Sequence, residues 1–396
     1  MSWIHTGKTQ AFNYTGLDKN MAQEHGIRLP AQYLVNKWQL THQALLMLAS
    51  LNDYDQQQVM KEIEYVTRYP STTYSTKHSL NPFRRIYRTR YPFRSYHYLI
   101  EYRTAANGQV VIDDILFDQS LQGAKAGNAA AERTMLYQVK RKNPSNYTGP
   151  ASQGDINSLQ DAWDEGKPVH QVITEHAAVN GMQNDQRKAA WLMGAHAHAA
   201  YQSDGISAYT LFHNPSDGWK LDLAECIFDK ASRSKSHNAQ HLAAVLAQVQ
   251  QQGKSVKWVV HSQGAIVFNA ALLHYRRHYG GQLHRQQLTI HGSGANVSKL
   301  TQIANGLGVK IVAARNNPFD VVPNLAGGND LSASSLCRSI KFCGLVFGKD
   351  SEPGVSPHTL PYLGIETYKQ QLLMFGQHKK ADQVQKYINK HAGKVS

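Results

Sequence analysis

The sequence predicts an α/β fold, with a mostly parallel sheet in a C-terminal domain that follows a smaller α+β domain. Strand-like and helix-like segments alternate after about residue 183, and a basic block of strands precedes them. A stretch rich in Pro, Ser, Gly and Asn separates the two parts. We therefore expect an N-terminal domain over 1–143, a linker and helical connection over 144–182, and the main domain over 183–396.

The N-terminal part is expected to combine helices with a short sheet. Apolar residues recur at helical spacing over 31–67, with a break near Asn52 and Asp53. Three strand-like runs follow, at 85–90, 95–103 and 109–117. Asn107-Gly108 lies between the last two runs and is a strong hairpin signal.

Helices and strands alternate along the C-terminal part. The predicted helical stretches are 183–201, 223–231, 237–251, 265–279, 299–305 and 365–375. The predicted strands are 207–212, 256–260, 288–290 and 309–313. This alternation favours a parallel sheet with helices on its faces.

Composition narrows the environment and the partners. The chain has 396 residues, is 41% hydrophobic, and carries a formal net charge of +14, which favours anionic surfaces or partners. It begins without a basic start and apolar run, so we expect synthesis in the cytoplasm without a cleaved signal, and any export by a specialised system. Three cysteines are too few for a disulfide framework, although Cys337 and Cys343 could pair.

A serine between a predicted strand and a predicted helix is the most informative feature. The strand 256–260 is followed by His261-Ser262-Gln263-Gly264 and then an apolar helix, which is the context of a nucleophile elbow. Ser262 is the expected nucleophile, although Val260 replaces the first glycine of that motif. The alternative interpretation is a serine that caps the helix.

A nucleophilic serine requires a base and a residue that orients the base, and both are expected after it in the chain. Asp320 follows the strand 309–313, which suits the acid. His358 precedes an amphipathic helix and suits the base. The alternatives are Asp330 and Asp350 for the acid, and His378 and His391 for the base.

Two backbone N–H groups are expected to form an oxyanion hole. Gln263 lies at a helix N-terminus, where negative charge is stabilised. The second donor is expected in the loop after the strand 207–212, at Asn214 or Ser216. That loop could equally be a plain turn into a helix.

Three segments carry a resemblance to a known group. They are 259–264, 317–320 and 357–362, supported by the loop 212–218. Together they resemble the lipase-like α/β-hydrolases of bacterial effectors and polymorphic toxins. The resemblance implies a serine esterase without cofactor, and a lipid or other ester as substrate. It also implies phospholipase activity, delivery by type VI secretion or a related route, and an immunity or delivery protein as partner.

The basic strands of the N-terminal part are similar in layout to ParE/RelE-type toxins, which implies contact with RNA. The arginines concerned are Arg84, Arg85, Arg88, Arg90 and Arg94. A solvated basic face, or a docking surface for an acidic partner, is the favoured interpretation, so nucleic acid is not an expected partner.

Two further features are assessed from their spacing. His196 and His198 lie two apart on a predicted helix and do not share a face, so no metal site is expected. The segment 325–348 separates Asp320 from His358 and predicts either an apolar lid or groove beside the site, or a variant last strand.

Overall fold

The computed structural model of the protein describes residues 14–36, 38–73, 75–77, 83–88, 98–117, 134–143, 153–181, 185–214, 237–348 and 352–392. The chain divides into two compact units, Met1–Leu121 and Gln122–Ser396. No helix within these ranges is both long and apolar enough to cross a membrane.

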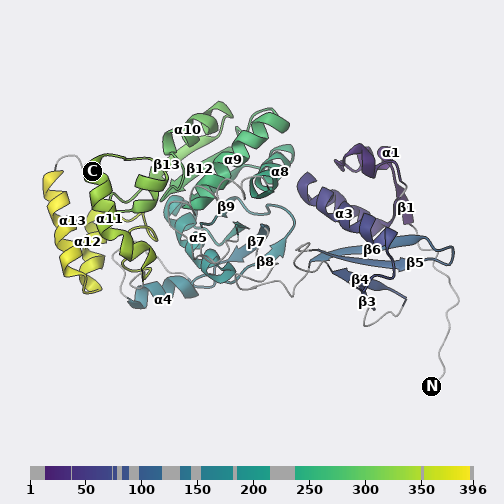
Figure 1. The fold of residues 1–396 in the computed structure, drawn as a ribbon, viewed down its shortest axis with the longest axis horizontal. Helices are drawn as coiled ribbons and strands as arrows, with labels where there is room; N and C mark the ends of the chain where they lie inside the picture. The colour runs from purple at the N-terminus through teal and green to yellow at the C-terminus, as the bar shows by residue number, and fades with distance from the viewer. Residues whose placement is uncertain are drawn as a thin grey trace, which may run out of the picture. The chain divides into compact units, whose positions relative to one another are not determined.

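The first unit packs helices against a sheet (Figure 1). Its described elements are β1 (Tyr14–Leu17), α1 (Lys19–Glu24), η1 (Ala31–Tyr33), β2 (Trp38–Thr41), α2 (His42–Ser50), α3 (Asp53–Arg68), β3 (Ser75–Lys77), β4 (Arg85–Arg88), β5 (Tyr98–Thr104) and β6 (Val110–Phe117). The strand order is β1-β2-β6-β5-β4-β3, and only β2 and β6 are parallel. This is the smaller α+β unit expected from the sequence.

The predicted break between the two long helices lies at Asn52. Its side chain accepts a hydrogen bond from the Asp55 N–H and caps α3. The beginning of the predicted helical stretch is wrong, because residues 38–41 form strand β2. Trp38 and Leu40 are buried and alternate with less buried neighbours, which is the period of a strand with one buried face. This strand pairs with β1 on one side and with β6 on the other.

The second unit contains the remaining described elements. They are β7 (Met135–Lys140), α4 (Gln153–Asp161), β8 (Lys167–Val169), β9 (His176–Val179), α5 (Gln186–Ala200), η4 (Gln202–Asp204), β10 (Ala208–His213), α8 (His237–Gln251), β11 (Val256–His261), α9 (Gln263–His278), β12 (Gln286–His291), α10 (Val297–Gly306), β13 (Lys310–Arg315), η6 (Val322–Ala326), α11 (Ala333–Phe347), α12 (Ile365–Met374) and α13 (His378–Lys390). The predicted helix at 223–231 lies outside the described residues.

The second sheet has the strand order β13-β12-β11-β9-β10-β7-β8. The strands from β13 to β10 are parallel, and β7 and β8 are antiparallel additions. In Figure 1, α8, α9 and α10 gather on one side of this sheet, and α4 and α5 on the other. The predicted α/β class is thus confirmed. The carboxyl ends of β9, β11 and β12 meet at one edge, where α/β proteins bind ligands.

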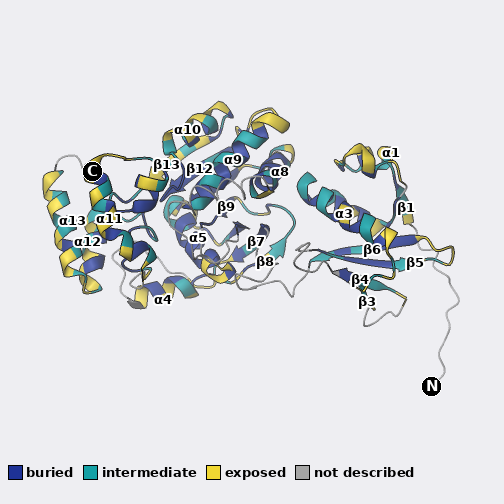
Figure 2. Ribbon diagram, in the orientation of Figure 1, coloured by how far each residue is buried: buried dark blue, intermediate teal, exposed yellow. Residues whose placement is uncertain are grey.

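The core of the second unit lies between the central strands and the helices that cover them. Figure 2 shows the central strands in dark blue, as buried, whereas α10 and α13 carry exposed residues in yellow. Trp258, Val260, Phe268, Leu288 and Ile290 are all fully buried there. Because the core holds both β11 and α9, the turn that joins them is held from both sides.

The expected domain boundary at residue 143 is wrong. Strand β7 precedes that position and pairs with β10, and β8 and β9 within 144–182 belong to the same sheet. The division therefore lies near residue 121, and the region expected to be a linker contributes to the main sheet. The segment 325–348 does not form a last strand, because it folds into the end of η6 and helix α11.

Close packing of α9 on β9 predicts that Gly264 tolerates no side chain. A Cβ at Gly264 would lie 2.3 Å from the Val179 carbonyl oxygen, whereas one at Gly344 on α11 would meet no atom within 4 Å. We expect Gly264→Ala to lower the free energy of unfolding by about 1–3 kcal/mol through overpacking. Gly344→Ala should be neutral or raise it by about 0.5–1 kcal/mol. Urea unfolding of both variants is the measurement, and equal stabilities would contradict the packing argument.

Candidate active site

Ser262 lies in a strained turn at the carboxyl end of β11. Its φ of 56° and ψ of −125° make it the one non-glycine residue with positive φ among those described. Its side chain makes no capping hydrogen bond to α9, although it occupies the N-cap position. The helix-capping alternative is therefore not the role of this hydroxyl. Positive φ at a serine costs free energy and is typical of functional turns.

The residues on both sides of Ser262 make this turn compatible with the fold. Gly264 brings the start of α9 against the carbonyl oxygens of Val179 and Asn180, which leave no room for a side chain. Val260 is fully buried in the sheet core, two residues before the serine. The valine that replaces the expected glycine therefore contributes to the core, and the turn retains its geometry.

Asp320 and His358 form a buried pair. His358 Nδ1 lies 2.6 Å from Asp320 Oδ2, and the Asp320 side chain is fully buried. The other carboxylate oxygen, Oδ1, accepts a hydrogen bond from the Val322 N–H. A carboxylate held in this way fixes the imidazole tautomer with a proton on Nδ1 and leaves Nε2 to accept one.

The structure brings His358 to the end of the strand that carries Ser262. The His358 ring packs on the ring of His261 with centroids 4.6 Å apart, and His261 immediately precedes the serine. Among the described residues, the Ser262 hydroxyl makes no hydrogen bond to His358. Such bonds are often long in unliganded sites and shorten in the substrate complex.

The alternative acid and bases lie elsewhere. Asp330 is engaged by the Ser332 hydroxyl in a local turn, and Asp350 lies outside the described residues. His378 begins α13, and His391 stacks on Tyr387 at the end of that helix. None of these contacts joins the Ser262 turn.

The expected role of Asn214 in the oxyanion hole is wrong. Its backbone N–H already donates to Asn180 Oδ1 over 2.7 Å, so it is not directed at the serine. Its side-chain amide instead donates to Gln263 Oε1 over 2.9 Å. Asn214 therefore organises the loops around the site, and Ser216 lies outside the described residues.

The loop after β9 lies closest to the serine, and sequence reasoning missed it. A Cβ at Gly181 would come within 2.5 Å of Ser262 Cβ and 3.1 Å of its hydroxyl oxygen. The Asn180 side chain fixes this loop by donating to the carbonyl oxygens of Gly181 and Asn214. The sequence signal for this strand is the short, mostly apolar run 176–179 followed by Asn-Gly, which lies within the expected linker and helical connection over 144–182.

Gln263 occupies the position expected of an oxyanion donor. It is the first residue of α9, so its N–H has no carbonyl one helical turn earlier to bond. Negative charge is stabilised near the free N–H groups at the N-terminus of a helix.

Three further histidines are buried behind His358. His261, His291 and His196 are each at most 3% exposed, and they come from β11, β12 and α5. Burial lowers the pKa of His196 and of His261 well below the usual range, and neighbouring imidazoles lower both further. Burial, with a contribution from Arg315, lowers the pKa of His291 to about 3. All three are therefore neutral near pH 7.

The cysteines considered for pairing are free. Cys337 is exposed and Cys343 is partly buried, and both lie on α11.

Two described arginines in the basic part of the first unit lie beside carboxylates. Arg84 lies 3.5 Å from both Glu101 and Asp113, and Arg103 lies 3.3 Å from Asp113. The Arg88 side chain, Arg90 and Arg94 lie outside the described residues. Cations paired in this way are less available to nucleic-acid phosphates.

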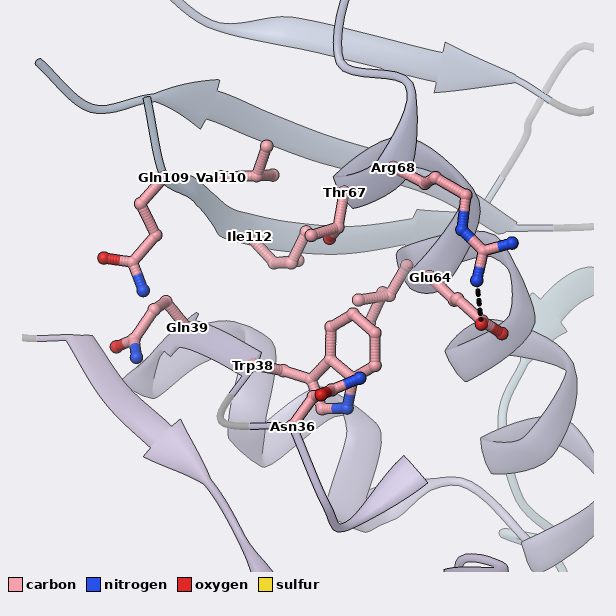
Figure 3. Close-up of a pocket in the computed structure, with 10 residues that line it drawn as sticks. Asn36, Trp38, Gln39, Glu64, Thr67, Arg68, Gln109, Val110 and Ile112 are labelled. Atoms are coloured by element: carbon pink, nitrogen blue, oxygen red, sulfur yellow. Dashed lines mark hydrogen bonds and ion pairs between the residues drawn. The ribbon is translucent and has the colours of Figure 1, made fainter. Parts of the chain in front are cut away.

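The first unit also has a pocket of about 300 Å³ (Figure 3). It is lined by Asn36, Trp38, Gln39, Ile63, Glu64, Thr67, Arg68, Gln109, Val110 and Ile112. Arg68 and Glu64 at its rim pair with each other over 2.9 Å. No serine, cysteine or histidine is among these described lining residues.

The comparisons with known proteins identify no family for this chain. No protein-family model matches the chain, and no curated protein matches it. One solved structure is similar to this chain, the crystal structure of Bacillus licheniformis lipase BlEst2 in mature form. The identity is 16%, the match covers 50% of this chain and 70% of the lipase, and the TM-score is 0.20. Neither the toxin nor the effector resemblance gains support from these comparisons.

The buried neutral histidines predict loss of stability in acid. Unfolded imidazoles bind a proton near pH 6.5, whereas folded His291 does so only near pH 3. Between these values the unfolded chain binds the extra proton, so the free energy of unfolding decreases as the pH falls. One such histidine costs about 2 kcal/mol at about pH 5.

We therefore expect the Tm to fall between about pH 7 and about pH 5, and His291→Gln to reduce this dependence. His284→Gln, at an exposed histidine of the same unit, serves as the control and should leave the dependence unchanged. Thermal unfolding across this pH range is the measurement. A His291→Gln profile parallel to that of the parent protein would contradict the assignment.

Proposed function

We propose that the protein is a serine ester hydrolase that acts through an acyl-enzyme, with Ser262 as nucleophile, His358 as base and Asp320 as the group that orients it. The observation that carries the proposal is a strained serine turn at the carboxyl edge of a parallel sheet, next to a histidine paired with a buried carboxylate. Chemistry of this kind requires no cofactor.

The proposed reaction proceeds in two stages. The Ser262 hydroxyl oxygen attacks the acyl carbon, and its proton moves to His358 Nε2 while Asp320 stabilises the imidazolium. The Gln263 N–H and the loop after β9 stabilise the oxyanion. Collapse breaks the ester C–O bond, and His358 returns the proton to the leaving alcohol. Water then attacks the acyl-enzyme by the same route and releases the acid.

We further propose that the substrate is a lipid, and specifically an ester in an anionic membrane. The segment between Asp320 and His358 supports this. Leu325 in η6 is 38% exposed, Leu331 in the segment before α11 is 60% exposed, and Ile340 on α11 is 61% exposed. Contiguous exposed apolar groups are typical of contact surfaces. The net charge of +14 favours an anionic partner for that surface.

This apolar segment begins beside the site. A Cβ at Gly327 would lie 2.6 Å from the Ser293 carbonyl oxygen, so the end of η6 packs on the loop after β12. The same loop donates from the Gly294 N–H to the Ser262 carbonyl oxygen over 3.0 Å. A lipid that rests on η6 and α11 would therefore be close to the serine turn.

Loss of the nucleophile should abolish turnover. We expect Ser262→Ala to lower kcat/KM for a short-chain ester by roughly a thousandfold or more, and to remove labelling by a fluorophosphonate probe. Ser293→Ala is the matched control, because Ser293 also follows a strand of the same sheet and its hydroxyl donates to the Ala295 carbonyl. Labelling that persists in Ser262→Ala and disappears in Ser293→Ala would overturn the proposed nucleophile.

Asp320→Asn and His358→Ala should each lower kcat sharply, without adding to the effect of Ser262→Ala, because the three groups act as a unit. His378→Ala provides the comparison for the base and should retain turnover. Kinetics of the single and double variants are the measurement. A large loss of kcat in His378→Ala with none in His358→Ala would show that His358 is not the base.

The lipid proposal predicts a dependence on charge and salt. Hydrolysis of anionic phosphatidylglycerol vesicles should exceed that of neutral phosphatidylcholine vesicles, and high salt should reduce the difference. Leu331→Ser and Ile340→Ser should lower the ratio of vesicle to soluble-ester turnover. Val312→Ser, at a residue 42% exposed on β13, should leave this ratio unchanged. Equal rates on both vesicles and on a soluble ester, independent of salt, would leave only a general esterase.

A further inference from the structure

The buried histidines form a connected cluster between the carboxyl ends of β11 and β12 and the loop 355–363, which carries His358 and is called the base loop below. His261 and His291 are the last residues of β11 and β12, and they are partners in the strand register. His196 comes from α5, and its Nδ1 lies 2.9 Å from His291 Nδ1. The His196 and His261 rings pack with centroids 4.4 Å apart. Helix α5 and strands β11 and β12 therefore each contribute one imidazole ring to the cluster.

Two neighbouring carbonyl groups of the base loop accept hydrogen bonds from this cluster. His261 Nε2 lies 2.9 Å from the carbonyl oxygen of His358, and His196 Nε2 lies 3.0 Å from that of Thr359. A carbonyl oxygen only accepts, so both Nε2 atoms carry a proton. His196 Nδ1 then accepts, and the donor to it is His291 Nδ1–H. One tautomer of each ring follows from these contacts.

The base loop lacks regular secondary structure, so it needs such contacts for its position. Residues 355–363 form turns between α11 and α12. The Asp320 bond fixes one edge of the His358 ring, but it does not fix the backbone from which that ring extends. The hydrogen bond from His261 to the His358 carbonyl does fix this backbone, and the two rings also pack in a tilted arrangement with an interplanar angle of 35°.

We propose that His261 is a positioning residue for His358, and that His196 and His291 support His261. This inference rests on the proposed function, in which His358 is the base. His261 is the residue directly before Ser262. One hydrogen bond from its ring therefore sets the separation between the backbone of the nucleophile and the backbone of the base.

The neutral state of the cluster suits this role. His358 must gain a positive charge in the transition state, and a cation stacked on it would oppose that change. Burial lowers the pKa of His261 well below that of a free imidazole, with the proximity of His358 as the next largest cause. Among the described residues, His358, Tyr362 and the Thr359 carbonyl contact the cluster, and the cations near it are Arg315 beside His291 and Lys188 on the side of His261.

Two substitutions at His261 separate the hydrogen bond from simple packing. His261→Phe keeps an aromatic ring but removes the donor, whereas His261→Gln places an amide N–H near the position of Nε2. We expect His261→Phe to lower kcat for a short-chain ester roughly a hundredfold, because a misplaced base costs about that factor. KM should change by less than about threefold. The rate of fluorophosphonate labelling should fall in parallel, and His261→Gln should restore most of it.

A second buried histidine provides the matched control. His176 begins β9, so it lies at the end of this strand away from the Ser262 turn, and its Nε2 bonds to Asp204 over 2.7 Å. His176→Phe should lower stability without lowering kcat when measured well below its Tm. If His261→Phe also lowers only stability, His261 is a structural residue and the proposal is wrong.

Imidazole tautomers in the unaltered protein give a test that does not depend on any variant folding. Nitrogen NMR of histidine-labelled protein near pH 7 should find Nε2–H on His261 and on His196, and Nδ1–H on His291. An Nδ1–H tautomer at His261 would remove the donor and overturn the proposal. Ser262→Ala distinguishes the two levels of inference. If that variant stays active, the proposed function fails; if it is inactive while His261→Phe turns over normally, only the positioning role fails.

Discussion

The close approach of α9 to β9 at Gly264 is the contact on which the arrangement of the site depends. Where a side chain would point at this glycine, the carbonyl oxygens of Val179 and Asn180 lie instead. This contact sets the angle at which the chain leaves β11, and the turn must then pass through Ser262 with positive φ. The free energy of packing in the core offsets the local strain, because Val260 and Phe268 on either side are fully buried.

Two loops that are distant in the sequence, those after β9 and β10, are held together near the same contact. β9 lies between β11 and β10 in the sheet, so the loops after β9 and β10 lie beside the serine turn. The Asn180 side chain both accepts from and donates to the backbone of Asn214, and it is fully buried. Buried amides that are satisfied in this way specify a single arrangement, since each lost bond leaves a desolvated polar group.

The histidine cluster combines a stability cost in acid with order around the base loop. Imidazoles that must stay neutral give up protons on folding, which lowers stability below about pH 6.5. The same burial removes competing water from the hydrogen bonds to the His358 and Thr359 carbonyls. Polar side chains in this cluster are thus explained by their hydrogen bonds, and apolar residues of similar size would not supply them.

The sequence by itself determined the α/β class, the alternation of elements after residue 183, and Ser262, Asp320 and His358 as a candidate set. These follow from local signals: an apolar strand that runs into Ser-x-Gly, and polar residues placed directly after strands or before a helix. Gly108, with a φ of 82° in the predicted hairpin turn, is a similar local success.

Only the tertiary structure decided which strands are neighbours, and the errors of the sequence reasoning share that cause. The sequence predicts an oxyanion donor at Asn214 because this residue follows an early strand of the domain, and the strand that precedes such a donor is expected beside β11. That place belongs to β9, a strand too short to be distinguished from the connection. Trp38 has helical spacing to its apolar neighbours in the sequence, but it lies in β2, which pairs with the distant strands β1 and β6. The approach of His261, His291 and His196 to the base loop likewise depends on strand register and long-range packing, which local periodicity does not encode.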